Sequence, residues 1–138
     1  MRVLWAGLLA AILMTASVSG AEFARARPAA QMPGGIPAFT WTLVSFPGVG
    51  EIAEPRYSVQ FLADGTVAIG ADCNRAVGTW SGGDGALDIT LGLQTLAACE
   101  EGSLEQPYLA ALDGVTGYNL SGATLVLYGA AGELVFTI

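Results

Sequence analysis

Short stretches of alternating apolar and polar residues recur along most of the chain, with glycine-containing turns between them. In the stretch 57–61, Ser58 and Gln60 alternate with three large apolar residues, which would place the apolar side chains on one face of a strand. Asp64-Gly65 follows it and predicts a tight hairpin turn. The pattern predicts eight short strands, at residues 39–45, 56–62, 66–71, 76–80, 87–91, 115–120, 124–128 and 134–138.

One stretch, at about 103–113, has apolar residues at helical spacing instead. Ser103 and Gln106 resemble a capping box at its start, and Gly114 predicts its end. The fold class is therefore mainly β: about eight antiparallel strands form a cracked, lipocalin-like barrel that one helix interrupts. An open sandwich is the alternative arrangement of the same strands. A barrel of this size holds only its own side chains or one small apolar ligand.

The first 38 residues lack this pattern. Met1-Arg2 is positively charged, residues 3–14 are apolar or small, and Ser19-Gly20-Ala21 offers small side chains before a cleavage point. The apolar run is shorter than the roughly 18 to 20 residues that a membrane span needs. We expect a signal peptide at 1–21, a flexible leader at 22–38 and one folded domain at 39–138. The domain is then exported, to a periplasm or the outside, without stable membrane insertion.

The charge is one-sided: 12 acidic residues face 5 arginines, with no lysine and no histidine, for a net charge of −7. A surface this negative repels nucleic acid, and it serves either solubility or docking to a basic protein. Without histidine, Ser-His-Asp and Cys-His catalysis are excluded. Glu100, Glu101 and Glu105 form the densest acidic group, where a helix dipole already favours them. Asp84 and Asp88 lack the spacing of a calcium loop and predict a turn.

Cys73 and Cys99 are the two cysteines of the chain. An even pair in an exported protein predicts a disulfide, because the compartment outside the cytosol is oxidising. Their spacing differs from the Cys-x-x-Cys redox motif, and a zinc site would lack histidine. We therefore expect a structural bridge that stabilises the fold by about 3 to 4 kcal/mol.

Three short segments share a pattern with a known family: Asp72-Cys73-Asn74-Arg75, Gly78-Thr79-Trp80 and Thr95-Leu96-Ala97-Ala98-Cys99. With them the chain resembles the META domain family, also called HslJ-like, and the motif falls on Asn74, Gly78, Trp80 and Thr95. The resemblance implies a β-barrel-like fold broken by a helix, a place in the cell envelope, an association with heat-shock or stress resistance, and no particular reaction. Two positions depart from the family: Asp72 stands where Gly is favoured, and Ala97 where Met is common.

Two groups of residues have both a structural and a binding interpretation. Asn74 is typical of a left-handed turn with local hydrogen bonds, and the alternative for its neighbour Arg75 is an anion contact at the barrel mouth. Six aromatic side chains are expected to face inward, as core or as the lining of an apolar cavity: Trp41, Tyr57, Phe61, Trp80, Tyr108 and Phe136.

We expect a monomeric, non-enzymatic binding or stress module without cofactor or metal, which holds a hydrophobic small molecule or a partner's peptide segment. The alternatives are an acidic inhibitor of a basic enzyme, and a purely structural protein with a filled core. The two binding hypotheses differ in salt dependence, because surface charge docking weakens with ionic strength.

Overall fold

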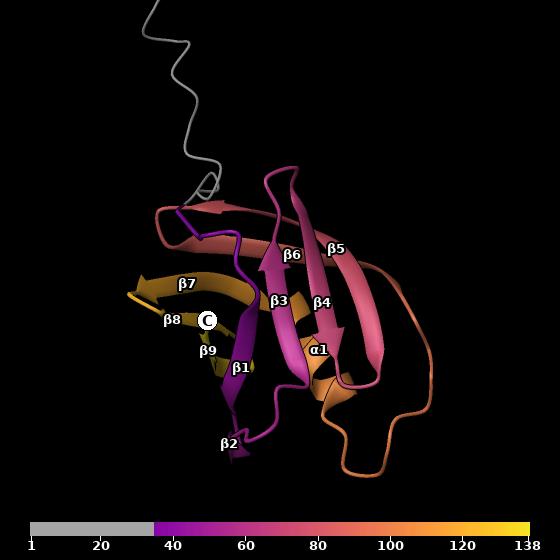
Figure 1. Ribbon diagram of the computed structural model, residues 1–138. Coiled ribbons are helices and arrows are strands. Elements are labelled where there is room, and N and C mark those ends of the chain that lie inside the picture. The colour runs from indigo at the N-terminus through magenta and orange to yellow at the C-terminus, as the bar shows by residue number, and fades with distance from the viewer. Residues whose placement is uncertain (1–34) are drawn as a thin grey trace, which may run out of the picture.

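The computed structural model describes residues 35–138, which form a barrel of strands with one helix (Figure 1). Buried and exposed side chains alternate along most of the strands. In β5, for example, buried and exposed residues alternate from Asn74 to Ser81. The strands are β1 (Trp41–Phe46), β2 (Gly50–Glu51), β3 (Tyr57–Phe61), β4 (Thr66–Ala71), β5 (Asn74–Gly83), β6 (Ala86–Gln94), β7 (Val115–Ser121), β8 (Thr124–Gly129) and β9 (Gly132–Thr137). One helix, α1 (Glu105–Asp113), lies between β6 and β7 in the chain.

The strands close into a barrel. Their order is β2-β1-β3-β4-β5-β6-β7-β8-β9, and β1 also pairs with β9, so eight antiparallel strands form a ring with β2 as an extra strand beside β1. The predicted mainly β, barrel-like fold with one helix is confirmed, and the open sandwich is excluded. The sequence pattern missed β2, which has only two residues, both exposed.

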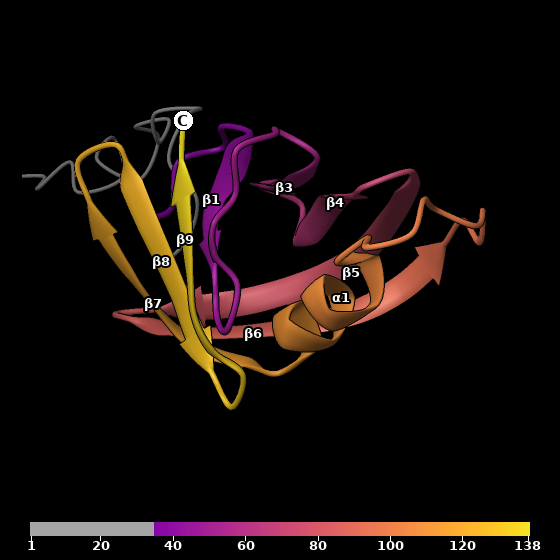
Figure 2. The same cartoon turned by 90° about the horizontal axis from the view of Figure 1, so that it is seen from below.

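The ring has its fewest registered residue pairs between β6 and β7, the two strands that the helix separates in the chain. Between β6 and β7 a single residue pair, Ala86 with Gly117, keeps the register. Seen from below, α1 lies beside the β8–β9 hairpin and in front of β5 and β6, at one end of the barrel (Figure 2). It contacts β6 and β4, and its completely buried Tyr108 packs edge-on against Tyr57. The helix therefore covers this end of the barrel.

The start of α1 corrects the sequence prediction. The helix begins at Glu105, and its N-cap, Leu104, makes no side-chain cap. Ser103 Oγ accepts a hydrogen bond from the Glu105 N–H, and the Leu104 N–H donates to the Tyr57 hydroxyl at 2.8 Å. The predicted capping box is wrong, because a hydroxyl from a distant strand takes one of the free helical N–H groups. The predicted end at Gly114 is confirmed.

The longest hairpin, β5–β6, extends beyond the predicted strands at 76–80 and 87–91. Asp84 and Gly85 form its two-residue turn, both with positive φ, of 55° and 88°. This is the geometry that fits the twist of paired strands, and it confirms the turn predicted at Asp84.

The packed structure begins before residue 39. Ile36 falls in the predicted leader 22–38, yet its side chain is completely buried in the core. Trp41 Nε1 donates to the Pro37 carbonyl at 3.2 Å, which fixes the chain just before β1. The predicted signal peptide at 1–21 lies outside the described residues. Within residues 35–138, no helix has the length and apolar character needed to cross a membrane.

The six aromatic residues considered for a cavity all lie in one buried core. Phe61 and Trp80 meet edge-to-face with their ring centres 5.5 Å apart, and Tyr108 packs against Phe136. Among the six, Tyr57 also reaches the wall of a surface cleft, described below. These rings pack against one another and against aliphatic side chains of several strands, and so make up much of the core.

Replacing Tyr108 by Phe tests how much the hydrogen bond of the Tyr108 hydroxyl stabilises this core. The Tyr108 hydroxyl donates to the Ser58 carbonyl at 2.9 Å, so the variant should lose about 1 kcal/mol of unfolding free energy. Burial, with a smaller contribution from Tyr57, raises the pKa of Tyr108 well above its usual value of 10.0. The unfolded chain therefore releases this proton first, and the native state loses stability as the pH rises above about 10.

The measurement is urea unfolding at about pH 8 and about pH 10.5. The parent should lose more stability between these pH values than Tyr108→Phe does. Tyr128→Phe, at a tyrosine that is 40% exposed, is the control and should match the parent at both. Equal alkaline losses in the parent and Tyr108→Phe would contradict the prediction.

Candidate functional site

The two cysteines form the predicted disulfide. Cys73, in the turn just before β5, is bonded to Cys99 in the segment that crosses from β6 to α1, with their Cα atoms 5.5 Å apart. Without the bond, this crossover would be held to β5 by noncovalent contacts alone. The bridge therefore fixes the segment that leads into the helix.

Asn74 binds the same crossover through its side chain. Its Oδ1 accepts from the Ala97 N–H and from the Thr95 hydroxyl, each at 2.8 Å, and its Nδ2 donates to the Ala97 carbonyl at 2.9 Å. The Thr95 hydroxyl in turn accepts from the Arg75 N–H. With Asn74 only 1% exposed, the amide works as a buried clasp between β5 and the crossover.

The expected turn role of Asn74 is wrong. Its hydrogen bonds go to residues more than twenty positions away, and the left-handed residue of this turn is Asp72, with φ of 57°. A positive φ is easiest for glycine and tolerable for aspartate. Asp72 therefore adopts the backbone conformation that the turn requires, at a position where the family resemblance led us to expect Gly.

The other two motif residues are also structural. A Cβ on Gly78 would lie 2.4 Å from the Thr90 carbonyl oxygen, so no side chain fits between β5 and β6 there. Trp80 Nε1 donates to the Leu62 carbonyl at 3.0 Å. The structure thus brings Asn74, Thr95 and the disulfide together in one clasp, and it places Gly78 and Trp80 further along β5.

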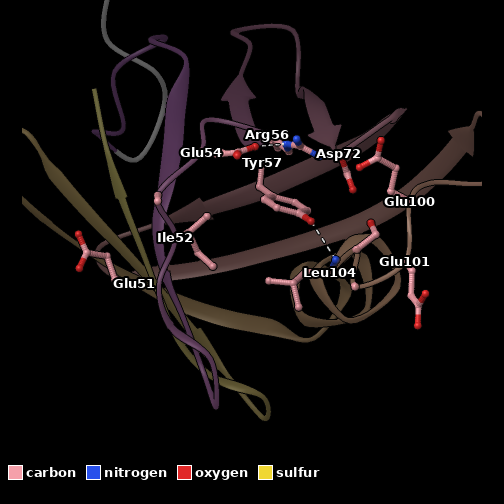
Figure 3. A pocket seen from close by; sticks show the side chains of 12 residues that line it. Glu51, Ile52, Glu54, Arg56, Tyr57, Asp72, Glu100, Glu101 and Leu104 are labelled. Atoms are coloured by element: carbon pink, nitrogen blue, oxygen red, sulfur yellow. Dashed lines mark hydrogen bonds and ion pairs between the residues drawn. The ribbon is translucent and has the colours of Figure 1, made fainter.

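A cleft of about 330 Å³ opens beside this clasp, between the loop after β2 and the turn before α1. We call it the acidic cleft. Five carboxylates line it, with one arginine and several neutral residues: Glu51, Glu54, Asp72, Glu100, Glu101, Arg56, Ile52, Ala53, Tyr57, Gly102, Ser103 and Leu104. Figure 3 shows Ile52, Tyr57 and Leu104 in the middle of the view, with the carboxylates of Glu51 and Glu101 turned outward at its margins.

The charges of the acidic cleft are only partly compensated. Arg56 makes ion pairs with Glu54 and Asp72, and the hydrogen bond and charge of Glu54 raise the pKa of this arginine. Among the described residues, Glu51, Glu100 and Glu101 have no ion pair.

The cleft also has an apolar part. Ile52 and Leu104 are partly buried and pack against the core. An apolar floor with an acidic rim suits an amphipathic cation, such as an arginine or lysine side chain.

Sequence reasoning found only part of this cleft. Glu100 and Glu101 stand in the turn before α1, and Glu105 is the first helical residue, as expected of acids near a helix N-terminus. No spacing or motif related Glu51, Glu54 and Asp72 to these acids, because the segments that carry them meet only in the folded barrel.

This architecture defines the chain as a small, disulfide-bonded antiparallel β-barrel domain with one end covered by a helix. The chain belongs to the META domain family, whose model matches residues 36–138.

Solved structures are similar in fold. A DUF4847 family protein from Bacteroides vulgatus superposes with a TM-score of 0.56 at 18% identity, over 72% of this chain and 92% of its own. A protein from Burkholderia xenovorans has a TM-score of 0.56 at 24% identity, over 72% and 81%. No curated protein matches the chain. At these identities the likeness shows the fold alone.

Proposed function

We propose that this chain is a non-enzymatic binding module of the cell envelope that docks a basic segment of a partner protein in the acidic cleft. The observation that carries the proposal is the cleft itself, with an apolar floor and three carboxylates that no described residue neutralises. The packing of the six aromatic residues in the core favours this outer cleft over the barrel interior as the binding place.

The chemistry of the cleft selects its ligand. The alkyl stem of an arginine or lysine would lie on Ile52 and Leu104, and the charged head would reach Glu100 and Glu101. An anion would meet repulsion at the same rim. A basic enzyme or a basic tail of an envelope protein is therefore the class of partner that fits, and the module would restrain that partner.

Other features support an envelope role without catalysis. The disulfide is of the kind that persists in exported proteins. With no histidine in the chain, the usual general base of nucleophilic catalysis is missing. The stress association implied by the family resemblance fits a protein that binds another in the envelope.

The test is a binding titration of the purified protein against an oligo-arginine peptide and against a basic enzyme such as lysozyme. The double variant Glu100→Gln/Glu101→Gln should bind each about three- to tenfold more weakly, since two exposed ion pairs are lost. Binding by the parent should also weaken as salt rises.

The matched control is Asp88→Asn/Glu133→Gln, which removes two exposed acids outside the cleft with the same change in net charge. It should bind like the parent. Equal weakening in both double variants would mean that net charge alone attracts the peptide, and the proposal would be wrong. Salt-insensitive binding would contradict it as well.

A further inference from the structure

A second depression lies on the outer face of the sheet, over β3 to β6. It consists of two adjoining hollows of about 340 and 290 Å³ that share Arg75, Ala76 and Val77. None of the residues that line the acidic cleft lines either hollow. We call the joined hollows the β4 groove.

Small residues of β4 make the floor of this groove. Cross-strand pairing places Gly70 between Ser58 of β3 and Arg75 of β5. Two residues earlier in β4, it places Ala68 between Gln60 and Val77. A Cβ on Gly70 would lie 2.7 Å from both Arg75 Nη1 and Ser58 Oγ. The guanidinium therefore lies over the glycine, next to a hydroxyl.

A β-bulge gives the groove its apolar end. Ala76 pairs with Gln94 and Gly78 with Leu91, so two residues of β6 face one residue of β5, and the alternation along β6 reverses. As a result Leu93 is 83% exposed, in the same hollow as Val77, which is 49% exposed. Regular alternation from Leu91 would have turned Leu93 inward.

Arg75 has no ion-pair partner in the described part of the chain. Both ion pairs there belong to Arg56, and the guanidinium of Arg75 has no hydrogen-bond partner among residues 35–138. The protein carries a net charge of −7, and Arg75 is one of two arginines among residues 35–138. The groove thus offers an anion contact with a hydroxyl at one end and apolar side chains at the other.

We propose that the β4 groove binds a free fatty carboxylate. The carboxylate would accept hydrogen bonds from Arg75 and Ser58, and the acyl chain would lie over Val77 and Leu93. A peptide fits less well, because the backbone groups of β3 to β5 are used in strand pairing and leave its amides unsatisfied. An acyl chain has no such groups to satisfy. This binding is independent of the acidic cleft.

The experiment titrates the purified protein with sodium laurate, below its micelle concentration, by calorimetry and by amide chemical shifts. Shifts should concentrate at Ser58, Arg75, Val77 and Leu93. Arg75→Gln should weaken binding about tenfold or more, because a charge-assisted hydrogen bond is lost. Leu93→Ser should weaken it through lost apolar contact, and Arg75→Lys should retain part of the affinity.

Arg56→Gln is the matched control, since it removes the other described arginine from the acidic cleft and should leave laurate binding unchanged. Dodecanol, with the chain but no charge, should bind as weakly as laurate binds Arg75→Gln. The proposal is overturned if Arg75→Gln, with an unchanged unfolding midpoint, binds laurate like the parent. It is also overturned if the laurate-induced chemical shifts lie outside the β4 groove, or if a peptide with an apolar C-terminus binds the groove more tightly than laurate does.

Discussion

The double variant Cys73→Ala/Cys99→Ala should lose about 3 to 4 kcal/mol of unfolding free energy. The bond joins residues 26 positions apart, and the closed loop contains the whole β5–β6 hairpin. Without it the unfolded chain gains conformational freedom, while the native barrel keeps its strand pairs. Urea unfolding, read by tryptophan fluorescence, measures the loss through a lower midpoint.

Reduction of the parent protein with dithiothreitol is the internal control, because it removes the same constraint without changing a residue. The reduced parent and the double variant should unfold at similar urea concentrations. A loss below about 1 kcal/mol would show that the bridge adds little to a crossover already held by other contacts.

Replacing Asn74 by Ala should lower the unfolding free energy by about 3 kcal/mol, because three hydrogen bonds to the crossover are lost and each contributes about 1 kcal/mol. Asn74→Asp should destabilise as well, since a carboxylate oxygen would then face the Ala97 carbonyl. Urea unfolding at neutral pH measures both variants.

Asn119→Ala, at an exposed position of β7, is the control and should change stability by less than about 0.5 kcal/mol. Combining Asn74→Ala with the cysteine double variant should give a loss that is not the sum of the two, because both act on one crossover. Strict additivity would contradict the view that bridge and amide form one clasp.

Sequence reasoning succeeded where local pattern decides the structure. Strands such as β3 bury every second residue, so alternation alone located them. It failed at the helix start, because the Tyr57 hydroxyl that binds the Leu104 N–H comes from a distant strand. It also ended the strand at residue 91, whereas β6 continues to Gln94 beyond a bulge that no residue type marks.

The candidate sites show the same limit. Carboxylates of the acidic cleft come from segments on both sides of the chain's midpoint, and no spacing rule relates them. For Arg75 the sequence raised an anion contact, but the position on the outer sheet face follows only from the register of β4 and β5. In this hairpin the two-residue turn at Asp72-Cys73 sets the register, and the pattern of residue types did not indicate that turn.

The pairing of β1 with β9 has a consequence for how the molecule is made. Thr42 and Thr137 are partners in this pair, so contacts that complete the ring join residues from nearly opposite ends of the described chain. Such high contact order slows folding, since the chain must close a long loop before the pair forms. During synthesis on the ribosome, β1 therefore cannot pair with β9 until β9 has emerged, and the ring closes only after that.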